Sequence, residues 1–145
     1  MSTVPEPDLG TWPTGRLLAV AARLVEQRWV TVLAGLDLTH AGLIALHTLR
    51  AGPLPQRTLA QRCQVTDQTM SRTLDRLAKS GFVTRTPDPA DARRHVTRMT
   101  ARGRTVLERA VRAEREDPAL LGGLGDDDAF RSRLLSLIAG LSAGD

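Results

Sequence analysis

Residues 56–81 read QRTLAQRCQVTDQTMSRTLDRLAKSG, and their pattern of apolar and polar side chains is the most informative in the chain. The hydrophobic spacing predicts two short helices here, residues 56–63 and 67–80, with Thr66 as the N-cap of the second. Only residues 64–66 separate the two helices. Two helices joined by so short a turn are typical of a helix-turn-helix, whose second helix enters the major groove of DNA.

The second of these helices has one apolar and one polar face. Met70, Leu74 and Leu77 recur at helical spacing, so we expect them to point inward. On the polar face, Gln68 and Arg72 are placed for hydrogen bonds to base edges. The predicted DNA contacts of this helix and its N-cap are Thr66, Gln68, Thr69, Ser71, Arg72, Arg76 and Lys79. A polar face that only contacts solvent is the alternative.

Two runs rich in β-branched residues follow, residues 82–86 and 95–99. They predict a β-hairpin in which residues 87–94 form a long basic tip. A helix-turn-helix followed by such a hairpin is a winged helix, and arginines on the wing can reach the minor groove of DNA. We therefore predict that Arg93 and Arg94 also contact DNA.

Positive charge is concentrated in the middle of the chain. Residues 50–115 carry 15 Arg and Lys against 6 Asp and Glu, a net charge of +9, whereas the whole chain has a net charge of +4. Such a basic block attracts a polyanion through phosphate contacts and counterion release. Asp91 lies inside this block, and we expect it to pair with an arginine and fix the shape of the wing. A solvated carboxylate in a loop is the alternative.

Amphipathic helices are predicted on both sides of the winged helix. The first, residues 15–33, has one apolar stripe that we expect to be buried, and Thr39 can cap the helix that follows it. After Thr100 a fifth helix is predicted, and glycines 122, 123 and 125 separate it from a final amphipathic helix. We expect the apolar stripe of this final helix to pack against the first helix and its copy in a second chain. Packing within a single chain is the alternative.

The predicted fold is therefore mainly α with a small β-hairpin: a winged helix-turn-helix with flanking dimerisation helices. Its parts are a flexible N-terminal segment at residues 1–14, a winged helix-turn-helix at 38–100, and a helical dimerisation region at 15–37 and 101–145.

Several other classes of protein are disfavoured. No segment approaches the roughly 18 uninterrupted apolar residues of a membrane span, and the first residues lack the order of a secretory signal, so we expect a cytoplasmic protein. The single Cys63 cannot form an internal disulfide, and the three histidines do not suggest a metal site, so no metal or cofactor is expected. No nucleophile, phosphate-loop or metalloprotease motif is present, and we do not expect an enzyme.

An ordered set of short motifs extends from residue 38 to residue 107. Their positions are residues 59–60, 65–66, 70–72, 74–77, 80–83, 88–93 and 99–103. The last two contain a D-x-R followed by an apolar-T-x-x-G. Together these motifs resemble the MarR family of bacterial regulators, although Met99 stands where Leu is usual and Pro55 where Ser or Thr commonly caps the helix.

This resemblance implies a homodimeric winged-helix transcription factor, usually a repressor, that binds a pseudo-palindromic operator in double-stranded DNA. A small effector, often an aromatic or phenolic acid, would release it. By placement alone, the candidates near the junction of the first, second and fifth helices are Trp29, His40, His47 and Arg50. We assign no effector and no effector-binding residue. Two alternatives to this function are a nonspecific architectural DNA-binding protein and a winged-helix module that binds protein.

Overall fold

The structure is a computed structural model that describes residues 8–117 and 127–144. The α-helices are α1 (Thr14–Ala34), α2 (His40–Thr48), α3 (Gln56–Arg62), α4 (Asp67–Lys79), α5 (Ala101–Glu116) and α7 (Asp128–Ser142), with 3-10 helices η1 (Leu9–Thr11) and η2 (Leu49–Ala51). The strands are β1 (Leu54–Pro55), β2 (Val83–Asp88) and β3 (Asp91–Met99), in the antiparallel order β1-β3-β2. The fold is a winged helix, as predicted.

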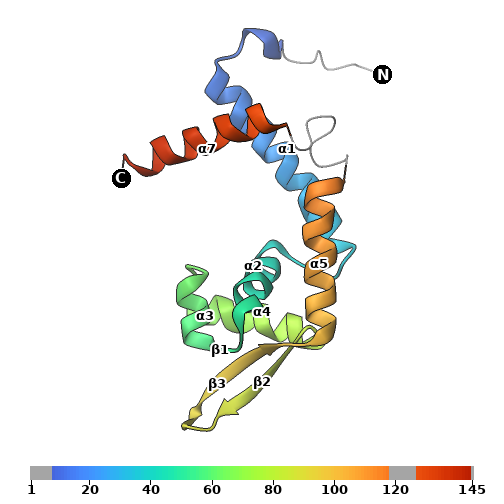
Figure 1. The fold of residues 1–145 in the computed structure, drawn as a ribbon, viewed down its shortest axis with the longest axis vertical. Coiled ribbons are helices and arrows are strands. Elements are labelled where there is room, and N and C mark those ends of the chain that lie inside the picture. The colour runs from blue at the N-terminus through green and yellow to red at the C-terminus, as the bar shows by residue number, and fades with distance from the viewer. Residues whose placement is uncertain (1–7, 118–126, 145) are drawn as a thin grey trace.

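The molecule is elongated (Figure 1). Helices α2, α3 and α4 form one lobe with the sheet, and α5 runs from this lobe toward α1 (Figure 1). Helices α1 and α7 lie at the end opposite the wing (Figure 1). None of the helices in the described residues is long and apolar enough to cross a membrane. Glycines 122, 123 and 125, expected to separate the last two helices, lie outside the described residues.

Short polar motifs set the ends of the helices. The threonine hydroxyls that accept a hydrogen bond from the backbone N–H three residues later are those of Thr39, Thr66 and Thr100, at 3.0, 3.1 and 3.0 Å. The residues in the left-handed conformation just beyond α1, α3 and α4 are Asp37, Gln64 and Gly81. At each of these three ends, a backbone N–H group bonds back to the last helical turn. The predicted caps are therefore confirmed.

The core lies between the helices of the lobe, the sheet and the first half of α5. The inward side chains predicted for α4, Met70, Leu74 and Leu77, are all buried. From α1, the buried residues are Trp29 and Leu33, and Leu24 of the predicted stripe is 51% exposed. The prediction of a buried stripe along α1 is therefore wrong for the single chain, because most of this helix extends beyond the lobe (Figure 1).

The strands of the wing are longer than the sequence suggests. Strand β3 begins at Asp91, so the hairpin turn contains only Pro89 and Ala90. Arg93 and Arg94 lie within β3, where the register shifts between the pairs Pro87–His95 and Asp88–Asp91, and the predicted long basic tip is wrong. The pairing of β2 with β3 gives the backbone more hydrogen bonds than a long loop would. The strand β1 was not predicted, because two residues are too few to show an alternating pattern.

Helix α5 lies directly against the turn between α4 and β2. A Cβ atom at Gly103 would be 2.1 Å from the carbonyl oxygen of Phe82, so no larger residue fits. Thr100 strengthens this junction: its hydroxyl donates to the carbonyl of Gly81 at 2.7 Å, and its backbone N–H donates to that of Phe82 at 3.0 Å. These contacts attach the start of α5 to the end of α4.

We predict that Gly103→Ala destabilises the protein by about 3 kcal/mol, because the nearest atom is backbone and cannot move aside. Gly140→Ala is the matched control. No atom lies within 4 Å of a Cβ at Gly140, so alanine there should stabilise α7 by up to about 1 kcal/mol. Urea unfolding followed by circular dichroism measures both changes. Equal changes in the free energy of unfolding for the two substitutions would contradict the close approach of Gly103 to the backbone of Phe82.

Thr97 of β3 is fully buried, and its hydroxyl has no hydrogen-bond partner among the described residues. Thr97→Val keeps the shape and removes the unsatisfied hydroxyl, so the free energy of unfolding should rise by about 1 kcal/mol. Thr97→Ser keeps the hydroxyl and should lower this free energy. A valine variant less stable than the wild type in urea would show that the hydroxyl is satisfied.

Candidate nucleic-acid interface

The side chains predicted to contact DNA from α4 lie on its outer face. The exposed ones are Thr66, Gln68, Thr69, Arg72, Arg76 and Lys79, and Ser71 is half-buried. The hydroxyl of Thr66 donates to the Thr69 hydroxyl at 3.0 Å, so both belong to the cap of the helix. In the part of the chain that the structure describes, Gln68 and Arg72 make no side-chain hydrogen bond. Their polar groups are available to a ligand, and contact with DNA stays a prediction.

The same face carries an ion pair that the sequence did not suggest. Asp75 of α4 accepts a hydrogen bond from the guanidinium of Arg85 on β2. The side chain of Arg85 is 26% exposed and that of Asp75 is 59% exposed, so the pair is partly shielded from solvent. It links the outer face of α4 to the base of the wing. The two residues belong to different elements, and only the folded chain brings them together.

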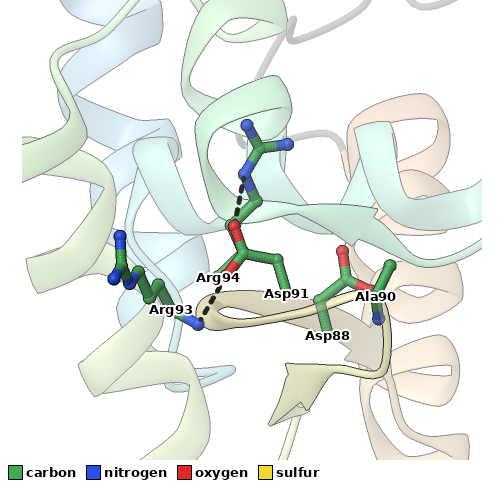
Figure 2. Close-up of polar contacts among 5 residues, drawn as sticks. All are labelled: Asp88, Ala90, Asp91, Arg93 and Arg94. Atoms are coloured by element: carbon green, nitrogen blue, oxygen red, sulfur yellow. Dashed lines mark hydrogen bonds and ion pairs between the residues drawn. The ribbon is translucent and has the colours of Figure 1, made fainter.

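Asp91 holds the start of β3. One of its carboxylate oxygens accepts the backbone N–H of Arg93 at 3.0 Å, and the other lies 3.8 Å from Nε of Arg94 (Figure 2). Asp88 accepts the N–H of Ala90 at 2.9 Å on the other side of the turn. The side chains of Arg93 and Arg94 point in different directions (Figure 2). This geometry suits the wing-structuring role of Asp91, which stays a prediction.

A groove of about 290 Å³ lies between α3, the start of α4 and the wing. The side chains lining this wing groove are Pro55, Gln56, Arg57, Thr58, Gln61, Asp67, Arg93, Arg94 and His95. The structure thus brings both predicted wing arginines close to the helix-turn-helix. Sequence reasoning missed the contribution of α3, where the polar residues Gln56, Arg57 and Gln61 were the available signal.

A second hollow, of about 440 Å³, lies between η2 and α5. The residues lining this α5 hollow are Arg50, Arg104, Leu107, Glu108, Val111, Arg112, Arg115 and Glu116. Its lining contains four arginines, two glutamates and two apolar side chains. Such a lining suits an anionic ligand that also has an apolar group. The volume falls within the range of about 300–1,000 Å³ that is typical of small-molecule sites.

The four residues that placement suggested for an effector do not all meet at one site. Arg50 lines the α5 hollow, whereas Trp29 is buried in the core. His47 borders a shallower hollow beside Arg50, and His40 is an exposed residue at the start of α2. Cys63 is half-buried, with its Sγ 3.6 Å from the Thr48 hydroxyl. No cluster of potential metal ligands occurs within residues 8–117 and 127–144.

Comparisons with known proteins agree with this geometry. The sequence model of the MarR family matches residues 34–94. The transcriptional repressor CouR, solved bound to a 23-mer DNA duplex, is 30% identical over 93% of this chain and 96% of its own, with a TM-score of 0.72. The PcaV transcriptional regulator from Streptomyces coelicolor is 28% identical over 92% and 100%, with a TM-score of 0.73. No curated protein sequence matches this chain.

A further solved relative is a mutant of MarR from E. coli complexed with operator DNA. It is 27% identical over 90% of this chain and 96% of its own, with a TM-score of 0.65. The fold and the exposed basic surface thus define a winged-helix transcriptional regulator. The chain belongs to the MarR family.

We predict that Asp75 and Arg85 are coupled by about 0.5–1 kcal/mol, as expected for a partly exposed ion pair. A double-mutant cycle with Asp75→Ala, Arg85→Ala and the double variant measures this coupling from urea unfolding. Additive effects of the two substitutions, to within about 0.3 kcal/mol, would show that the pair does not stabilise the wing.

Proposed function

We propose that this protein is a cytoplasmic homodimeric repressor that binds a pseudo-palindromic DNA operator and is released by a small aromatic or phenolic acid. One observation carries the proposal. Helix α4 has an exposed polar face, its first residue shares a groove with Arg93 and Arg94 of the wing, and both elements lie within a block whose net charge is +9. Side chains on α4 can read base edges in the major groove, while the wing arginines bind phosphates or the minor groove.

The exposed apolar side chains support the dimer. On α7 these are Phe130, Leu135, Leu137, Ile138 and Leu141, and on α1 they are Leu24 and Val30. No described residue of α7 is buried within the single chain, which disfavours the alternative of packing inside one chain. A second copy would cover both helices. A two-fold axis there would present two α4 helices to successive major grooves, about 34 Å apart.

The α5 hollow is the best candidate for the effector site. Arg50, Arg104 and Arg112 could pair with a carboxylate while Leu107 and Val111 contact an aromatic ring. Helix α5 connects the lobe to the proposed dimer region, so a ligand here would act on the distance between the two α4 helices. The ligand would release DNA only if it bound more tightly to a dimer whose α4 helices are wrongly spaced for DNA than to the DNA-binding dimer.

A random-sequence DNA selection with the purified protein tests the proposal. We expect a pseudo-palindrome, bound about 10³ times more tightly than a scrambled duplex in the same salt. Equal affinity for both duplexes would identify a nonspecific architectural protein instead. Absence of any salt-dependent DNA binding would favour a module that binds protein.

Arg72 and Arg93 should contribute in different ways. Arg72→Ala should cost about 1–3 kcal/mol on the selected operator and relax base preference at one position per half-site. Arg93→Ala should weaken binding to all duplexes and lower the slope of log affinity against log salt by about 1. Fluorescence anisotropy at several salt concentrations separates the two effects. If neither variant changes affinity, the proposed surface is not the DNA-binding surface.

The dimer should depend on the apolar face of α7. Ile138 is 58% exposed in the single chain, and Ile138→Asp should weaken the dimer by about 2 kcal/mol or more, because it would bury a charge. Ser136→Asp adds the same charge to an exposed position of the same helix and is the matched control. Light scattering over a range of concentrations gives the dissociation constants. Equal dissociation constants for the two variants would place the interface elsewhere.

A further inference from the structure

The wing groove contains one carboxylate, that of Asp67, among several cationic side chains. Asp67 is the first residue of α4 and is exposed. It shares the groove with Arg57 of α3 and with Arg93 and Arg94 of the wing. Within residues 8–117 and 127–144, its carboxylate takes part in no ion pair and no hydrogen bond. Both oxygens are therefore free to accept hydrogen bonds from a ligand.

The start of α4 does not depend on this carboxylate. Thr66 is the N-cap, and its hydroxyl accepts the backbone N–H of Thr69 at 3.1 Å. Asp67 adds only the interaction of an exposed negative charge with the helix dipole, which is weak and screened by salt. An uncharged residue would also leave the groove more attractive to phosphates. The carboxylate thus lowers general affinity for DNA at the point where a recognition helix first meets the bases.

The chemistry of base edges shows what could compensate for this loss. An ionised carboxylate only accepts hydrogen bonds, and the major groove offers just two amino donors, N4 of cytosine and N6 of adenine. In adenine the amino group lies beside the acceptor N7, which repels a carboxylate. Guanine and thymine present only acceptors, apart from the thymine methyl group. Cytosine is therefore the base that a carboxylate at this position favours.

We infer that Asp67 is a specificity-determining residue that accepts a hydrogen bond from N4 of one cytosine in each half-site. The inference rests on the proposed function, in which α4 occupies the major groove. N-terminal residues of recognition helices are the ones that contact base edges, and Asp67 is the first residue of α4. Arg57 and the wing arginines bind the flanking phosphates and hold the helix end at the base.

The experiment is a random-sequence DNA selection with four full-length proteins: the wild type, Asp67→Asn, Asp67→Ala and Glu114→Gln. The wild type should prefer cytosine about tenfold at one position of each half-site. Asparagine offers both a donor and an acceptor, which match N7 and N6 of adenine, so Asp67→Asn should prefer adenine there. Asp67→Ala should lose the preference and bind scrambled DNA more tightly. The base preferences at the other positions of the half-site should be the same in all variants.

Glu114→Gln is the matched control, because it removes one negative charge from an exposed position of α5 that borders neither the wing groove nor the α5 hollow. It should raise affinity for all duplexes slightly and keep the preference for cytosine. Unchanged base preferences in both Asp67 variants would overturn the inference while leaving the proposed function intact. If the wild type selects no sequence, both the inference and the proposed function are overturned. The wild-type selection therefore distinguishes failure of the proposed function from failure of the inference alone.

Discussion

The close contact between α5 and the backbone of the turn after α4 is the constraint on which the rest of the structure depends. Gly103 provides the space, and Thr100 provides the hydrogen bonds to Gly81 and Phe82. With no room for a side chain between them, the start of α5 and the end of α4 must move together. A displacement of α5 therefore displaces α4, which is the physical route by which the proposed effector beside α5 would act on the proposed DNA-binding face.

The acidic residues of the basic lobe have distinct surroundings. Asp75 pairs with Arg85 across α4 and β2, and Asp91 holds the backbone and side chain of the wing arginines. Each of these carboxylates lies beside an arginine and can stabilise the shape of the surface. Asp67 has no such partner within the described residues, and its negative charge stays in the wing groove. Asp75 and Asp91 thus stabilise the proposed DNA-binding surface, whereas Asp67 is free to contact a base.

Local signals in the sequence predicted most of the lobe. The threonine caps and the inward side chains of α4 depend on neighbours within a few residues, and both predictions were confirmed. The errors arose where distant segments meet. The pairing of Asp88 with Asp91 extends β3 past Arg93 and Arg94, which lie in an irregular stretch of the strand without partners on β2. The wing groove forms only when α3 approaches the wing. The exposed apolar face of α1 shows the same limit, because hydrophobic spacing does not reveal which surface covers it.

Hydrogen exchange at the junction shows whether the end of α4 and the start of α5 move as one unit. The backbone N–H groups of Thr100 and Gly103 bond to the carbonyl of Phe82 and the hydroxyl of Thr100, at 3.0 Å each. If α4 and α5 form one cooperative unit, these two amides should exchange with the same free energy of opening as those of Leu74 and Leu77. Exchange of the junction amides through a separate opening of lower free energy would contradict this coupling, because α5 could then move without α4.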